Sequence, residues 1–271
     1  MKTSNHLLRR LTAALLAAVL ALSIALPVFA SDDGDTIYIN SVSDLLSLAR
    51  NCAYDQWSVG KTVILQKDLS LEGMLWEPIP SFSGQFKGSG HTISDLTITG
   101  QYSPAGLFGI VEEQGSIESL SVRGVVSVSD SADTTTGGIA GINHGTLISC
   151  QFTGVVTGDS EVGGIVGRNE SEGTIDHSTA RAIVTGKSST GGIAGYNLGA
   201  ITGCTNVGSI NTEYPEASLD TDGFTAKMVD YINNKMAAAD DDATNSVTNV
   251  ATDTGGIAGR SSGMILTSVN T

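Results

Sequence analysis

The sequence predicts an all-β protein built as a parallel β-helix, and a recurring glycine-rich phrase is the main reason. The phrase reads GGIAGINHG at 137–145, GGIVGRNES at 163–171, GGIAGYNLG at 191–199 and GGIAGRSSG at 255–263. Counted from AGLFG, the phrases begin at 105, 137, 163, 191 and 255, so they are 32, 26, 28 and 64 residues apart. Repeats of about 20 to 50 residues are typical of stacked architectures. The apolar runs between the glycines are short and have no helical period, which indicates coils made of strands.

Equivalent positions of the repeat should stack in columns about 4.8 Å apart, because each strand of a β-helix pairs with its equivalent in the next coil. We expect strands of three to five residues, interior isoleucines, asparagines stacked at a corner, and glycines that supply the positive φ angles of tight turns. The interior isoleucines are Ile139, Ile165, Ile193 and Ile257. The structural residues of the repeat are Gly106, Gly109, Gly137, Gly138, Gly141, Asn143, Gly163, Gly164, Gly167, Asn169, Gly191, Gly192, Gly195, Asn197, Gly255, Gly256 and Gly259.

The first thirty residues read as a signal peptide that is removed on export. Lys2, Arg9 and Arg10 precede an apolar stretch at 11–26, and residues 28–30 form a small-x-small cleavage pattern. Loss of these three positive charges changes the formal net charge from −14 to −17. Such an acidic surface should not bind nucleic acid or anionic lipid. We expect a secreted or cell-surface protein without membrane contact after cleavage; an uncleaved membrane anchor is the alternative.

Residues 31–80 should form an N-terminal cap and the first coil, followed by the repeat coils at 81–210. In the segment SVSDLLSLARNC, Ser41 and Asp44 occupy capping-box positions. Leu45, Leu48, Ala49 and Cys52 then lie on one helical face. A helix with a polar back is expected here, because the first edge of a solenoid needs protection.

The long gap before the last phrase predicts a helical insertion at 211–254. Phe224, Met228, Ile232 and Met236 recur every fourth residue, which indicates a helix with one apolar stripe. Residues 255–271 should then form an incomplete final coil. Its edge would present unpaired backbone groups, so we expect it to be continued by further sequence or covered by a partner.

These residues resemble the GLUG-repeat proteins over roughly residues 36–271. The resemblance lies in SGQFKGSGHTISDLTI at 83–98, in the literal Gly-Leu-x-Gly core at 106–109, and in the series of Gly-Gly-Ile phrases. GLUG repeats are found in exported bacterial proteins, often attached to the cell surface, and in the N-terminal region of immunoglobulin-A-cleaving zinc metallopeptidases. The resemblance implies a right-handed β-helix related to pectate lyases. It implies no single activity.

The sequence offers no metal or cofactor motif. His91, His144 and His177 are scattered, and the His-Glu-x-x-His signature of zinc peptidases does not occur. The repeat is also too long for a calcium-binding β-roll, whose period is nine residues. The segment DTDG at 220–223 lacks the later glutamate of a calcium loop and reads as a helix N-cap.

Two carboxylates are the sharpest catalytic candidates. Glu118 and Asp176 follow equivalent isoleucines, so they should share a column two coils apart, about 9.6 Å. That distance is near the upper end of the separation used by inverting glycosidases. Arg123 and Arg181 should share a second column. The simpler interpretation of both pairs is a solvated outer face.

Cysteines and tryptophans read as packing residues. Cys150 and Cys204 should lie in one column with a serine coil between them, too far apart for a disulfide, so we expect free buried thiols. Trp57 and Trp76 fall near the cap, where Trp76 should cover the first coil. The alternative is a sugar-stacking platform.

Three functions remain open. The first is a non-catalytic, exported β-helix module for adhesion or display, with an extracellular glycan or a host protein as partner. The second is the N-terminal module of a larger surface metallopeptidase. The third is a polysaccharide-active enzyme that uses Glu118 and Asp176.

Overall fold

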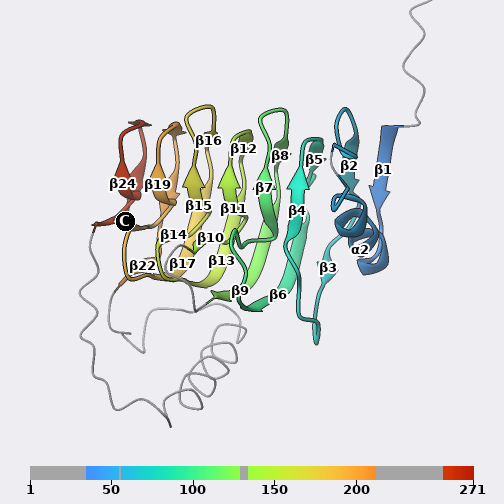
Figure 1. The fold of residues 1–271 in the computed structure, drawn as a ribbon, viewed down its shortest axis with the longest axis horizontal. Coiled ribbons are helices and arrows are strands. Elements are labelled where there is room, and N and C mark those ends of the chain that lie inside the picture. The colour runs from blue at the N-terminus through green and yellow to red at the C-terminus, as the bar shows by residue number, and fades with distance from the viewer. Residues whose placement is uncertain (1–34, 55, 129–133, 212–252) are drawn as a thin grey trace, which may run out of the picture. The chain divides into compact units, whose positions relative to one another are not determined.

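The described part of the chain is a parallel β-helix. The computed structural model describes residues 35–54, 56–128, 134–211 and 253–271. Their elements belong to one compact unit, Thr36–Thr271, in which about six turns stack between helix α2 at one end and β24 at the other (Figure 1). The strands pair in parallel and form four sheets. The predicted β-helix is therefore confirmed.

Sheet A contributes one strand of three or four residues to each coil. Its strands are β1 (Thr36–Ile39), β2 (Thr62–Leu65), β5 (Gln85–Lys87), β8 (Ser116–Glu118), β12 (Thr146–Ile148), β16 (Thr174–Asp176), β20 (Ala200–Thr202) and β25 (Met264–Leu266). The middle residues of β8, β12 and β16 are Ile117, Leu147 and Ile175, and all three are fully buried. Their neighbours on each strand therefore point outward, because side chains alternate between the two faces of a strand.

Sheet B contains strands that are longer than the sequence predicts. Its members are β3 (Leu69–Ser70), β6 (Thr92–Gly100), β9 (Ser121–Val128), β13 (Gln151–Thr157), β17 (Thr179–Thr185), β21 (Thr205–Asn206) and β26 (Val269–Asn270), and β22 (Ser209–Ile210) also pairs with β17. The expected limit of five residues is wrong for β6, β9, β13 and β17, which have nine, eight, seven and seven residues. Pairing continues through Gly154, whose φ of 146° lets the strand bend without ending.

Sheets C and D carry the glycine phrase. Sheet C consists of β4 (Ile79–Phe82), β7 (Phe108–Val111), β11 (Ala140–Asn143), β15 (Val166–Asn169), β19 (Ala194–Asn197) and β24 (Ala258–Ser261). Sheet D consists of β10 (Thr135–Gly137), β14 (Glu161–Gly163), β18 (Thr190–Gly191) and β23 (Thr254–Gly255), so each of its strands ends on the first glycine of a phrase. The phrase thus adds a fourth side to the coils. The final segment, expected as an incomplete coil, contributes one strand to each sheet, β23 to β26.

An asparagine ladder runs along the end of sheet C inside the solenoid. Asn143, Asn169 and Asn197 are fully buried. The Nδ2 group of Asn143 donates to Oδ1 of Asn169 at 2.7 Å, and that of Asn169 donates to Oδ1 of Asn197 at 2.8 Å. Asn197 in turn donates to Ser261 Oγ at 3.2 Å. The ladder gives each of these buried Nδ2 groups an acceptor in the next coil, whereas Oδ1 of Asn143, at the start of the ladder, has no hydrogen-bond partner among the described residues.

The phrase glycines allow close packing rather than positive φ angles. None of them is among the positive-φ residues, so that expectation is wrong. A Cβ atom on Gly138 would lie 2.2 Å from the ring of Phe152, and one on Gly167 would lie 2.5 Å from the backbone nitrogen of Thr136. The second glycine therefore faces a sheet B side chain, and the third lets a sheet D strand cross the outside of sheet C. Any larger side chain would separate these layers.

The left-handed corner lies elsewhere, between sheets A and B. It is occupied in successive coils by Ser119, Ser149, His177, Gly203 and Thr267, with φ between 46° and 62°. Only one of these residues is glycine. Serine, histidine and threonine therefore hold a conformation that costs a non-glycine residue free energy, and parallel pairing on both sides imposes it.

The predicted capping helix is present as α2 (Val42–Asn51). The Ser41 side chain accepts from the backbone N–H of Asp44, and the Asp44 carboxylate accepts from Asn40 N–H at 2.9 Å. These bonds also hold the pKa of Asp44 below its ordinary value. Leu45, Leu48 and Cys52 are buried against the first coil.

Two predicted segments lie outside the described residues. They are the signal peptide at 1–30 and nearly all of the helical insertion at 211–254. At the borders of the latter, Asn211 Nδ2 donates to Thr254 Oγ1 at 3.2 Å.

Candidate functional site

Glu118 and Asp176 lie in one outward column of sheet A. Ile148 pairs with Glu118 on one side and with Asp176 on the other, so one coil separates the two carboxylates. Both side chains are partly exposed, beside the buried residues Ile117 and Ile175. The carboxylates therefore stand on an outer face with an aliphatic side chain between them.

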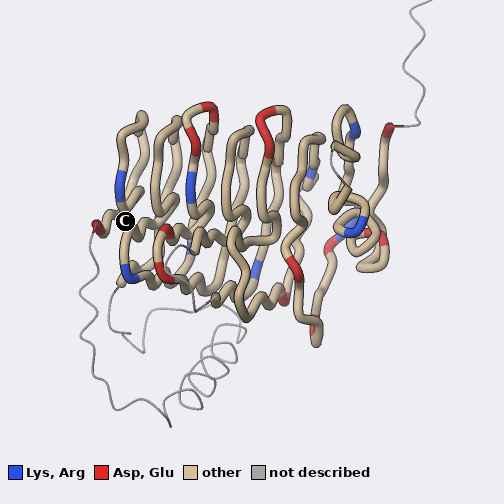
Figure 2. The backbone as a smooth tube through the Cα atoms, viewed as in Figure 1, with Lys and Arg blue, Asp and Glu red and all other residues tan. Residues whose placement is uncertain are grey.

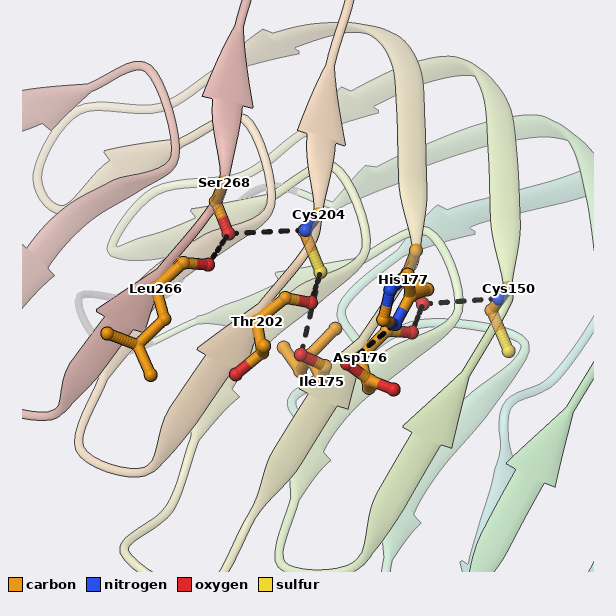
Figure 3. Close-up of polar contacts among 9 residues, drawn as sticks. Cys150, Ile175, Asp176, His177, Thr202, Cys204, Leu266 and Ser268 are labelled. Carbon is orange, nitrogen blue, oxygen red and sulfur yellow. Dashed lines mark hydrogen bonds and ion pairs between the residues drawn. The ribbon is translucent and has the colours of Figure 1, made fainter.

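Each carboxylate has a basic residue beside it. Lys87 is opposite Glu118 in the register of β5 and β8. His177 Nδ1 lies 2.8 Å from Asp176 Oδ1, and both residues are seen at the corner in Figure 3. The imidazole is 67% exposed, so this pair is solvated and contributes little to stability.

Arg123 and Arg181 occupy a separate column on sheet B. Both pair in register with Thr153, one from each side, and both are exposed. The left-handed corner lies between this column and the carboxylates. The arginines therefore do not face Glu118 and Asp176 across a common cleft.

Cys150 and Cys204 line the interior just after the left-handed corner, with Ser178 in the coil between them. Both thiols are free. The Cys150 backbone N–H donates to Ser178 Oγ at 3.1 Å, and the Cys204 N–H donates to Ser268 Oγ at 3.2 Å (Figure 3). The Cys204 thiol donates to the carbonyls of Thr202 and Ile175 at 3.4 and 3.5 Å. Small polar side chains here bond backbone groups of the corner that would otherwise lack partners.

Burial makes these thiols poor nucleophiles. Desolvation raises the pKa of Cys150 from its ordinary value of 9.0 to about 12, and it raises the pKa of Cys204 to about 11. Cys52, in the cap, is raised to about 11 for the same reason. A thiolate is the reactive form, so none of the three resembles an activated cysteine.

The three described histidines lie in different coils, His91 and His177 at the corner between sheets A and B and His144 at the corner between sheets C and A. His91 Nδ1 lies 3.1 Å from Asp68 Oδ1, His144 follows β11, and His177 follows β16. Among the described residues, no three histidine, cysteine, aspartate or glutamate side chains are grouped so that they could hold a metal ion. The sequence segment DTDG lies outside that part of the chain.

Trp76 belongs to the core. It is 1% exposed, and its Nε1 donates to the Leu107 carbonyl at 3.2 Å. Trp57 is partly buried, and Lys61 Nζ lies 5.4 Å from its ring centroid. The Trp76 ring therefore offers no open face for sugar stacking.

One outward column of sheet C was not anticipated from the sequence. Tyr196 lies between Arg168 and Arg260, whose guanidinium carbons are 5.2 and 5.3 Å from its ring centroid. Arg168 also pairs with Glu161 and Glu170 at 3.2 and 2.9 Å. The sequence did contain a signal for this column. The residue just before the asparagine of the phrase, or before Ser261 in the last phrase, is Arg168, Tyr196 and Arg260 in successive coils.

Acidic residues concentrate in two protruding corners between sheets C and A. Figure 2 shows these as red loops after β7 and β15. They contain Glu112 and Glu113 in one corner and Glu170 and Glu172 in the other. Both corners have four residues, at 112–115 and 170–173, whereas the coil between them turns in two residues at 144–145.

The fold and its repeated phrase define the class of protein: a parallel β-helix that carries the GLUG motif. Residues 158–185 match the family model described as "The GLUG motif", and this stretch contains β14 to β17. The resemblance to GLUG-repeat proteins is thereby confirmed.

Two known proteins are similar to this chain. Halomucin from Haloquadratum walsbyi is 31% identical over 155 residues, which cover 52% of this chain but only 2% of halomucin. The crystal structure of a candidate immunoglobulin A1 protease from Bacteroides ovatus aligns with a TM-score of 0.43 and 15% identity, over 70% of this chain and 81% of that one. No helix of the described residues is long and apolar enough to span a membrane.

Proposed function

We propose that this chain is an exported, cell-surface β-helix module that acts by binding, in adhesion or display, and catalyses no reaction. The filled interior is the observation that carries the proposal. Ile117, Leu147, Ile175 and Ile201 stack along it with no exposed surface. A ligand must therefore bind the outer faces, and long stacked faces suit extended partners such as a glycan or a host protein.

Export and charge support an extracellular role. The predicted signal peptide directs the chain out of the cell. The full chain has a formal net charge of −14, and removal of the three positive charges in the signal peptide gives −17. This negative charge disfavours nucleic acid and anionic membranes as partners. The similarity to halomucin, by its name a mucin-like protein, is consistent with an extracellular repeat protein.

Binding and cleavage by the full chain test the proposal against the enzymatic alternative. The chain is incubated with immobilised polysaccharides and extracellular matrix proteins, and bound protein and released sugar are both measured. We expect binding without sugar release, and an unchanged result for Glu118→Gln combined with Asp176→Asn. Sugar release that disappears in this double variant would establish the polysaccharide-active alternative instead.

The edge of the last coil is proposed to be continued by further coils or covered by a partner. Met264, Ile265, Leu266 and Val269 are 54%, 39%, 46% and 49% exposed. Such an apolar strand edge invites pairing with another strand. Light scattering of the full chain should reveal association, and a strictly monomeric, soluble chain at high concentration would contradict this part of the proposal.

A further inference from the structure

A polar hollow lies beside the N-terminal cap, where the corner between sheets C and A changes length. In the coil of β4 and β5 this corner is Ser83–Gly84, but in the next coil it is the four-residue segment 112–115, closed by a hydrogen bond from Gly115 N to Glu112 O at 2.8 Å. The longer corner forms one wall of the hollow. The volume is about 360 Å³, and the lining residues are Gln56, Val59, Ser81, Ser83, Glu112, Glu113 and Gln114.

Both walls are held in place by hydrogen bonds. On the cap side, the Ser83 backbone N–H donates to Ser58 Oγ at 2.9 Å, and Ser58 is only 3% exposed. On the other side, Ser81 Oγ donates to Glu112 Oε1 at 2.7 Å, which orients that carboxylate toward the floor. The site is therefore preorganised, which lowers the entropic cost of binding.

The described residues leave most of the hydrogen-bonding capacity of the hollow unused. Among the described residues, the side chains of Gln56, Glu113 and Gln114 make no hydrogen bond, and Glu112 has one oxygen engaged by Ser81. The hollow therefore presents carboxylate acceptors together with amide groups that both donate and accept.

We infer that this hollow binds the hydroxyl groups of a neutral sugar; the inference rests on the proposed binding function and names its site. A hydroxyl donates to a carboxylate and also accepts from an amide, so it satisfies both kinds of lining group. An ammonium, a guanidinium or a metal ion would use the carboxylates and the amide oxygens but would leave the amide N–H groups without an acceptor in the ligand. Acidic sugars are disfavoured because two carboxylates and no basic side chain line the hollow. Val59, 41% exposed, provides an apolar contact for the C–H face of a sugar ring.

Affinity measurements with defined polysaccharides test this inference. The full chain is titrated with mannan, galactan and xylan as neutral probes and with polygalacturonate as the acidic probe. We expect binding to at least one neutral probe and none to polygalacturonate. Glu112→Gln should weaken the neutral interaction about tenfold, the usual effect of losing one charge-assisted hydrogen bond.

Two further variants separate binding from folding. Gln114→Ala removes an exposed side chain that bonds no described residue, so it should weaken binding several-fold without lowering the Tm. Glu172→Gln is the matched control, because it makes the same charge change in the other four-residue corner and should leave affinity unchanged.

Three results would overturn the inference. Equal affinity in wild type, Glu112→Gln and Gln114→Ala would place the sugar elsewhere while leaving the proposed function intact. Failure of the wild type to bind any neutral probe would also overturn it, and binding to matrix proteins would then show whether the broader function survives. A rise in Tm with calcium chloride alone, lost in Glu112→Gln, would identify a cation site instead.

Discussion

The two ends of the solenoid use the same strands but bury them differently. Near the N-terminus, the rings of Phe82, Phe86 and Phe108 pack with centroids 5.4 to 6.2 Å apart, and α2 covers the first coil. In the last coil, Ile265 is 39% exposed, although Ile201, its partner one coil earlier, has no exposed surface. An interior side chain of a β-helix is therefore buried by the next coil as much as by its own coil.

The largest difference should come from truncating one interior side chain at each end. Phe108→Ala should lower the free energy of unfolding by about 4 kcal/mol, because it removes a fully buried ring and leaves a cavity. Ile265→Ala should cost less than about 1 kcal/mol, because its side chain is already partly in water. Urea denaturation of both variants measures the two values. Similar losses would show that the last coil is covered in solution.

Adding a methyl group at the second glycine of a phrase should give a smaller difference in the free energy of unfolding between the two ends. The Cβ of Gly138→Ala would meet the buried ring of Phe152 at 2.2 Å, so we expect a loss of about 2 kcal/mol in the free energy of unfolding. The equivalent Gly256→Ala would meet the Asn270 side chain at 2.5 Å. Asn270 is exposed in the last strand, where it accepts a hydrogen bond from Asn206 Nδ2 at 2.7 Å, so displacing it should cost less than displacing a buried ring. A cost for Gly256→Ala as large as for Gly138→Ala would contradict the packing role assigned to the second glycine.

The smallest effect concerns the two interior thiols. Cys204 is one coil from the end and Cys150 is three, so fraying of the last coil should expose Cys204 first. Iodoacetamide at neutral pH should therefore alkylate Cys204 faster in the native protein, as measured by mass spectrometry of peptides. Faster reaction at Cys150 would show that opening does not start at the C-terminal end.

The same thiols give stability a dependence on alkaline pH. The pKa of Cys150 is raised from 9.0 to about 12 in the fold, so between these values the unfolded chain loses a proton that the folded chain keeps. Stability should be unaffected by this group below about pH 9 and should fall above it. Cys150→Ser, compared with the wild type by urea denaturation from pH 8 to pH 10.5, should reduce that fall.

Much of the fold could be predicted because repetition makes local patterns reinforce one another. The columns of Glu118 and Asp176, of Arg123 and Arg181, and of the two cysteines lie where equal spacing from the phrase places them. The capping helix could also be predicted, because its capping residues and its apolar face all lie within twelve consecutive residues.

Contacts between sides of the coil could not be read from one unit. The role of Gly138 depends on Phe152, fourteen positions away in the chain, and that of Gly167 depends on the strand of Thr136 in the preceding coil. The left-handed corner was missed because serine, threonine and His177 occupy it in four of five coils, whereas positive φ was expected at the glycines of the phrase.

The sequence by itself determined the coil, its period, its apolar interior and its cap, because these depend on residue type at regular spacing. Only the tertiary structure decided how the sides meet and where the surface is hollow. The polar hollow exists because one corner, 112–115, is two residues longer than the corner stacked beneath it, and the cap stands opposite. The sequence shows the length of each corner separately. The hollow forms only when the coils stack, because the longer corner then projects beyond the shorter corner next to it.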